Sequence, residues 1–205
     1  MPRFISIFLC LALLTGCSSH KIQTQTVIYH GDMHKNRGAI IIRPVDSAWD
    51  DSLEFNAVKS AIAVRLKKHS YILTADEASA SYKALVSYGI DEGRAKTVYQ
   101  PIKQPYANTA VTLQKNAGNT SLATTEVIPH YYVSGHQPVN IIEYKKHLFI
   151  DIYDMSTQKK VYEIRTYCLG TENLLQEVIL KLVEAAFISF PAENGKCYTR
   201  DVYID

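Results

Sequence analysis

The sequence predicts an α+β fold: one mostly antiparallel (mixed) sheet with two helices packed on one face, a two-layer sandwich. Segments 82–90, 141–153 and 160–168 alternate apolar and polar residues, which is typical of strands with one buried face. Two other segments repeat apolar residues at helical spacing instead. The chain also holds fourteen tyrosines against one tryptophan, an excess that favours half-buried sheet surfaces.

The first half of the chain predicts a strand, a helix and a second strand in succession. After a short strand at 27–29, an isoleucine-rich strand at 39–43 ends at Pro44. Residues 50–52 offer helix caps, and residues 53–68 carry apolar residues along one face and basic residues in the last turn. A short strand at 69–73 follows, and this connection is long enough for a right-handed parallel crossover.

The second half predicts a hairpin, a helix and an edge strand. The alternating segments 141–153 and 160–168 flank a turn at 154–158. Residues 171–173 cap a very apolar helix that runs to about Phe187, and we expect its apolar face to be buried against the sheet. A last edge strand covers 198–204.

Between these halves lies the least regular segment, residues 94–140. It contains four prolines and short apolar pieces without a sustained period. Long stretches of this kind are usually functional or mobile. We expect hairpin arms here that project from the sheet.

The first residues read as an export signal. Arg3 precedes the almost wholly apolar stretch 4–14, which is too short for a membrane span of about 20 residues. The sequence Leu14-Thr15-Gly16-Cys17 resembles the lipobox of bacterial lipoproteins. That resemblance implies removal of a signal peptide at 1–16 and acylation of Cys17, with palmitate among the acyl groups. An ordinary secretory signal, cut nearby to release a soluble protein, is the alternative.

The residues after the signal define the expected domain organisation. Ser18 follows the cysteine in place of aspartate, and in enterobacterial-type sorting this implies the outer membrane, with the protein on its periplasmic face. The polar stretch at 17–26 resembles a lipidated tether, and residues 27–205 are expected to form a single domain.

Composition limits the partners and the redox chemistry. With 22 basic and 20 acidic residues and no basic stripe, nucleic acid is an unfavoured partner. Cys10 leaves with the signal, so Cys168 and Cys197 remain as a pair in an oxidising compartment. We expect a disulfide between them; two free thiols are the alternative. No CxxC motif and no zinc-ligand spacing is present.

Short motifs from about residue 38 to residue 200 resemble those of a group of uncharacterised proteobacterial envelope lipoproteins, classed as a domain-of-unknown-function family. The motifs are Ser52-Leu53-Glu54-Phe55, Ser87-Tyr88-Gly89-Ile90-Asp91-Glu92-Gly93-Arg94, the strand Tyr144…Leu148-x-Ile150-x-Ile152-x-Asp154, and Phe190-Pro191-x-x-Asn194-Gly195. The resemblance implies a compartment and a fold, and it brings no catalytic residues.

Candidate catalytic and metal-binding groups are few. His30-Gly31-Asp32-Met33-His34 reads as a polar turn, so we expect no metal site and no cofactor. Asp151 and Asp154 lie three apart on a strand and therefore face opposite sides. An acidic site near Asp91-Glu92, with nearby loop histidines, is the basis of an alternative function, an envelope hydrolase.

The favoured function is a non-enzymatic binding or structural module of the bacterial envelope. It would be held to the membrane through Cys17 and would bind an envelope protein. The candidate contact residues are amphipathic tyrosines in and beside the irregular segment: Tyr99, Tyr106, Tyr131, Tyr132 and Tyr144. A third interpretation is a small lipid or glycan bound between sheet and helices.

Overall fold

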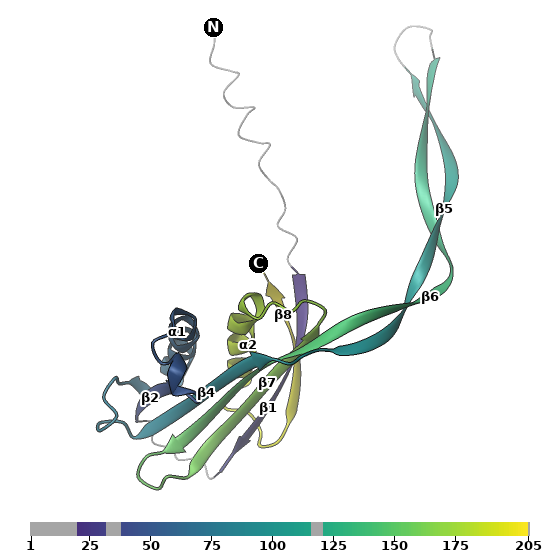
Figure 1. Cartoon of the computed structure of the whole chain (residues 1–205). Helices are drawn as coiled ribbons and strands as arrows, with labels where there is room; N and C mark the ends of the chain where they lie inside the picture. The colour runs from purple at the N-terminus through teal and green to yellow at the C-terminus, as the bar shows by residue number, and fades with distance from the viewer. Residues whose placement is uncertain (1–19, 32–37, 116–120, 205) are drawn as a thin grey trace, which may run out of the picture. The chain divides into compact units, whose positions relative to one another are not determined.

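The structure is a computed structural model that describes residues 20–31, 38–115 and 121–204 (Figure 1). It divides into two compact units. Residues 94–142 form one unit, here called the hairpin unit. The described residues on either side of it in sequence form the other, here called the body. The signal at 1–16 and the lipidation residue Cys17 lie outside the described residues.

Over the described residues, one mixed sheet of eight strands dominates the fold, with two α-helices beside it, as the sequence predicted in coarse terms. Strand β2 runs parallel to β3 and β4, and the pairs β4–β6, β6–β7, β7–β1 and β1–β8 are antiparallel. The parallel crossover through the first helix is therefore confirmed. Across the sheet the order is β3 (Ile72–Leu73), β2 (Ala39–Pro44), β4 (Tyr82–Ile90), β6 (Ser121–Asp154), β7 (Lys160–Gly170), β1 (His20–His30) and β8 (Cys197–Ile204), with β5 (Arg94–Lys115) paired to β6 off this path.

The first helix, α1 (Leu53–Lys68), has the bounds that its sequence predicts. The Ser52 side chain accepts a hydrogen bond from the backbone N–H of Phe55, which caps the helix. Glu54 lies in the first turn and basic residues in the last, so both ends complement the helix dipole. A short 3₁₀ helix, η1 (Ser47–Trp49), precedes it.

The second helix, α2 (Gln176–Ile188), begins later than expected. Residues 171–173 do not cap it: its N-cap is Leu175, which provides no side-chain hydrogen bond. The helix contacts β7, β1 and β8, whereas α1 contacts β2 and β3. Its apolar face is buried, as predicted.

The core lies between the helices and every second residue of the central strands. Leu148, Ile150 and Ile152 of β6 are fully buried, as are Ile62 and Leu66 of α1. The residues that alternate with them on β6, such as Phe149 and Asp151, are only half-buried. This confirms the predicted alternation of β6, and β7 follows the same pattern.

The expected tether at 17–26 is wrong from His20 onward, because β1 begins there and pairs with both β7 and β8. Thr24 and Thr26 are buried in this strand, at 0 % and 2 % exposure. The Thr24 hydroxyl donates to the backbone oxygen of Arg200, and the hydroxyls of Thr26 and Thr166 bond to each other. Because their hydroxyls are hydrogen-bonded, these threonines can lie on the buried face of the sheet. A polar sequence can therefore form an inner strand.

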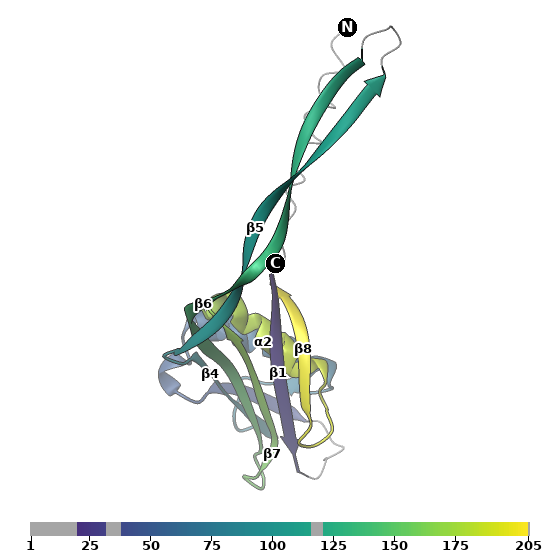
Figure 2. The same ribbon diagram turned by 90° about the vertical axis from the view of Figure 1, so that its right-hand side faces the viewer.

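The segment 94–140 forms a hairpin, as expected, although it is more regular than its sequence indicated. It lies in β5 and β6, two long strands whose described residues coil about each other (Figure 2). Thr97 bonds to Asn140, Ser134 to Ile102 and Tyr132 to Gln104. These contacts progress in opposite directions along the two strands, so the unit is an antiparallel hairpin.

Candidate functional site

Exposed tyrosines are concentrated in the hairpin unit. Tyr99 is 71 % exposed, Tyr131 61 %, Tyr132 49 % and Tyr106 45 %. A two-stranded hairpin has no core on either face, so its aromatic side chains remain available to a partner. Tyrosine suits such surfaces because it combines a large apolar ring with a polar tip.

Contacts within the hairpin unit hold part of this surface in place. The Tyr106 ring lies 6.1 Å from the Tyr132 ring and 5.6 Å from the His130 ring, measured between centroids. The Tyr132 hydroxyl donates to Gln104 Oε1 at 2.7 Å. We call Tyr99, Tyr106, Tyr131 and Tyr132 the tyrosine surface; it includes both faces of the hairpin, because Tyr131 and Tyr132 are consecutive residues of β6. Ordered aromatic groups lose little entropy on binding, which favours a contact role.

Tyr144 is separated from the other predicted contact residues. It belongs to the body, is half-buried and pairs with Gly170 of β7. Ile102, Val133 and Ile142 of the hairpin unit are exposed apolar residues that the sequence interpretation did not single out. These residues are β-branched and lie in a tyrosine-rich segment, and this combination in the sequence could have indicated them as contact residues.

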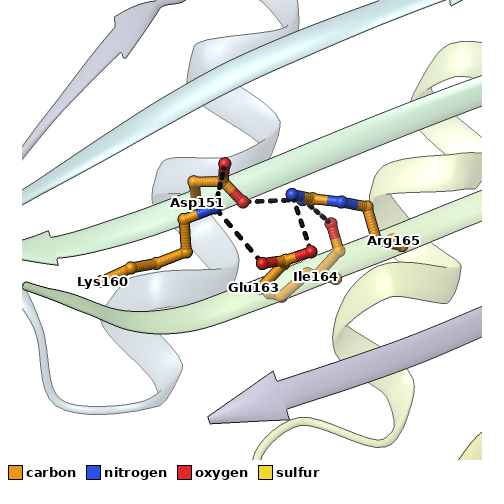
Figure 3. A network of polar contacts seen from close by, with 5 residues as sticks. All are labelled: Asp151, Lys160, Glu163, Ile164 and Arg165. Carbon is orange, nitrogen blue, oxygen red and sulfur yellow. Dashed lines mark hydrogen bonds and ion pairs between the residues drawn. The ribbon is translucent and has the colours of Figure 1, made fainter. Parts of the chain in front are cut away.

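The face of the body sheet that carries Asp151 holds a closed network of charges (Figure 3). Asp151 accepts from Arg165 Nη1 at 2.6 Å and from Lys160 Nζ at 2.9 Å. Glu163 pairs with the same two cations, at 3.0 Å to Arg165 and 3.2 Å to Lys160. The hydrogen bond to Asp151 is the main cause that raises the pKa of Lys160. Because both carboxylates are neutralised by partners, neither is poised as a general base.

Asp154 caps the turn between β6 and β7, as the sequence indicated. Its carboxylate accepts from the backbone N–H groups of Ser156 and Thr157 and from the Ser156 hydroxyl. These bonds, the Ser156 hydroxyl first, lower the pKa of Asp154. Asp151 and Asp154 therefore serve separate local structures.

Asp91 has a structural role where β4 ends. Its Oδ1 accepts from the backbone N–H of Gly93 at 3.1 Å and of Lys145 at 2.8 Å. Gly93 has φ of +80°, a left-handed conformation that glycine adopts without strain. The carboxylate of Asp91 thus closes a turn, and Glu92 is exposed beside it.

His147 is the histidine that interacts with this acidic turn. It lies opposite Gly89 in the β4–β6 register, and a Cβ on Gly89 would stand 3.1 Å from its ring. The ring also packs on Phe149, with 4.7 Å between centroids. Burial lowers the pKa of His147, the charge of Lys145 adds to this, and Asp91 opposes it.

The lowered pKa of His147 predicts a loss of stability in mild acid. The unfolded chain takes up the proton near the ordinary histidine pKa of about 6.5, before the folded chain does, so folding weakens as pH falls below that value. Urea unfolding at about pH 7 and about pH 5 should show this loss in the parent protein and a smaller loss in His147→Gln. His136→Gln, in the hairpin unit, is the control and should behave like the parent. An unchanged pH dependence in His147→Gln would contradict the assignment.

The predicted disulfide is absent: Cys168 is a buried free thiol and Cys197 an exposed one. Strand β1 lies between them, because Cys168 pairs with Thr24 and Cys197 pairs with Val27. Two strand spacings separate the backbones by about 10 Å, and a disulfide spans at most about 7 Å between Cα atoms. Thr24 faces the core whereas Val27 faces the other side, so the two thiols also point apart.

His30 is the last residue of β1. Its ring nitrogens bond to the backbone oxygens of Gly31 and Ala192. Asp32, Met33 and His34 lie outside the described residues. Within the part of the chain that the structure describes, no group of three or more His, Cys, Asp or Glu side chains is placed to hold a metal ion.

Among the described residues, no helix has the length and apolarity that a bilayer crossing needs. No family model and no curated protein matches the sequence.

Similarity to solved structures is limited to the fold. A PDZ domain protein from Parabacteroides distasonis aligns at a TM-score of 0.50 and 12% identity, over 89% of this chain and 39% of that chain. This chain therefore spans well under half the length of that structure, and at this identity the similarity shows the fold alone. A dodecamer of a PelC point variant from Paraburkholderia phytofirmans aligns over 82% of this chain and 94% of that chain, at 11% identity and a TM-score of 0.36, too low to indicate a shared fold.

Proposed function

We propose that this chain is a lipid-anchored, non-enzymatic module of the bacterial envelope that binds a protein partner through its hairpin unit. The observation that carries the binding role is the tyrosine surface, four exposed tyrosines on two paired strands. Interfaces are enriched in tyrosine, and buried tyrosines commonly dominate binding energy. The carboxylate of Asp91 is hydrogen-bonded to backbone N–H groups, and that of Asp151 is paired with Lys160 and Arg165. These contacts give no support to the alternative envelope hydrolase.

The anchor in this proposal is Cys17, acylated after removal of residues 1–16. The lipobox-like sequence supports it, as does the resemblance to uncharacterised envelope lipoproteins. Ser18 favours the periplasmic face of the outer membrane. Since β1 begins at His20, at most about 10 Å of extended chain separates the acylated residue from the sheet. The body is then held close to the bilayer.

Within the body, we propose that the two helices form a single layer on one face of the sheet. The shared core of α1, α2 and the inward residues of β6 supports this two-layer arrangement. The other face, with its ion pairs, then remains open to the periplasm.

Site-specific photocrosslinking in intact envelopes tests the binding role. A photoreactive phenylalanine analogue at Tyr131 should give a discrete crosslinked product, because 61 % of that side chain is exposed on the tyrosine surface. The same analogue at Tyr203, 55 % exposed on the body, is the matched control and should not. Adding Tyr99→Ser and Tyr132→Ser should reduce the Tyr131 product about tenfold or more, since anchor residues contribute about 2 kcal/mol each.

Equal products from both positions, or none from Tyr131, would contradict a partner on the hairpin unit.

A further inference from the structure

The body contains a cavity of about 530 Å³ between Lys146 of β6, the end of β7, the start of β1 and the first turn of α2. Its size falls in the range of small-molecule sites. All of its lining residues belong to the body, so it is independent of the tyrosine surface and of the function proposed for it.

Lys146 is the unusual residue of this cavity. It occupies an inward position on β6, two residues before Leu148, and is only 2 % exposed, yet it lines the cavity. Within the described residues, no hydrogen bond or ion pair joins its ammonium group to another side chain. The side chain is buried along its length while the residue lines the cavity, so its ammonium group can meet an anion there.

Gly170, which has no side chain, lies beside the ammonium group of Lys146. A Cβ on Gly170 would lie 3.5 Å from Lys146 Nζ, so a larger residue at 170 would stand against the charge. The first turn of α2 borders the same cavity through Val178, and its N-cap has no side-chain hydrogen bond. The partial positive charge of a helix N-terminus adds to that of the lysine.

The other residues that line the cavity indicate the chemistry of the rest of the ligand. Ile22, Cys168 and Val178 provide apolar surface, and burial raises the pKa of the Cys168 thiol, which keeps it neutral. The exposed carboxylates of Glu172 and Glu177 also border the cavity. They disfavour ligands with several negative charges and leave a single carboxylate on an apolar chain as the best match.

We infer that this cavity binds a fatty carboxylate. Its carboxylate pairs with Lys146 Nζ, and its chain lies against Ile22, Cys168 and Val178. Lys146 is then a binding residue that supplies the positive charge of the site.

Calorimetric titration tests this with three probes. The protein is the full chain carrying Cys17→Ser, in which no acyl group of the anchor competes. Decanoate should bind at least about tenfold more tightly than decanol, which lacks the charge, and than acetate, which lacks the chain.

Two variants assign the site. Lys146→Met should weaken decanoate binding at least about tenfold while Tm without ligand changes little, because methionine keeps the buried apolar part of the side chain. Gly170→Val, which obstructs the ammonium group, should also weaken it. Lys145→Met is the control: its neighbouring ammonium lies over the Tyr167 ring on the other face, and binding should be unchanged.

Equal affinities for decanoate and decanol, undiminished decanoate binding in both site variants, or absence of decanoate binding to the parent would each overturn the inference.

Discussion

Replacing Phe55 with alanine is expected to lower the free energy of unfolding by about 3–5 kcal/mol. Phe55 is fully buried in the first turn of α1, where it belongs to the core that joins both helices to the sheet. Its removal leaves a cavity that a sheet of fixed register cannot close. Urea denaturation with an unchanged slope measures the loss.

Leu53→Ala is the matched control. Leu53 lies two residues earlier on the same helix but is 87 % exposed, so its truncation should change stability by about 0.5 kcal/mol or less. Equal losses in the two variants would mean that α1 packs on the body through a different face.

Removing the hairpin unit is expected to abolish crosslinking to the partner and leave the body folded. Strands β4 and β6 are antiparallel neighbours whose paired residues run to Ile90 and Lys146. An Asn-Gly turn joining Gly93 to Glu143 would therefore connect them as a simple hairpin. A shorter connection also lowers the cost of loop closure, so body stability should change by about 1 kcal/mol or less.

Circular dichroism melting and amine-reactive chemical crosslinking in intact envelopes, each compared with the parent chain, measure the two effects of this deletion. A deletion variant that fails to fold would show that residues 94–142 are required by the core. A folded variant that still forms the crosslinked product seen with the parent chain would remove the binding role from the hairpin unit.

Local signals in the sequence were sufficient for α1 and for the strand Tyr82–Ile90, whose bounds agree with the structure. A serine cap, apolar residues at helical spacing and terminal basic residues all act within one helix. The same holds for the alternation of β6 and β7, where one face is buried and the other is solvated.

Signals that depend on distant partners were missed. The start of β1 reads as a polar tether because its inward residues include Thr24 and Thr26, whose hydroxyls are satisfied only by Arg200 and Thr166. The absent disulfide has the same origin, since sequence spacing does not reveal that β1 separates Cys168 from Cys197.

The hairpin unit was read as irregular for a different reason. Strand prediction relies on burial of one face, and a two-stranded hairpin buries neither. Pro101, Pro105 and Pro138 further obscured it, although proline is tolerated where an edge N–H faces solvent. The candidate tyrosines were identified nonetheless, because a concentration of tyrosines in one segment can be seen in the sequence without knowledge of its secondary structure.

Lys146 was not identified from the sequence, although a signal was present. It occupies an inward position in the row that continues with Leu148, Ile150 and Ile152. A lysine in such a row is either at the end of the core or beside a ligand, and only the structure shows that it is buried.

Metabolic labelling with radioactive palmitate tests the central claim, the acyl anchor, most directly. The parent chain and Cys168→Ser should both incorporate label and sediment with the outer membrane, whereas Cys17→Ser should incorporate none. A parent chain without label, or label that persists in Cys17→Ser, would contradict the account.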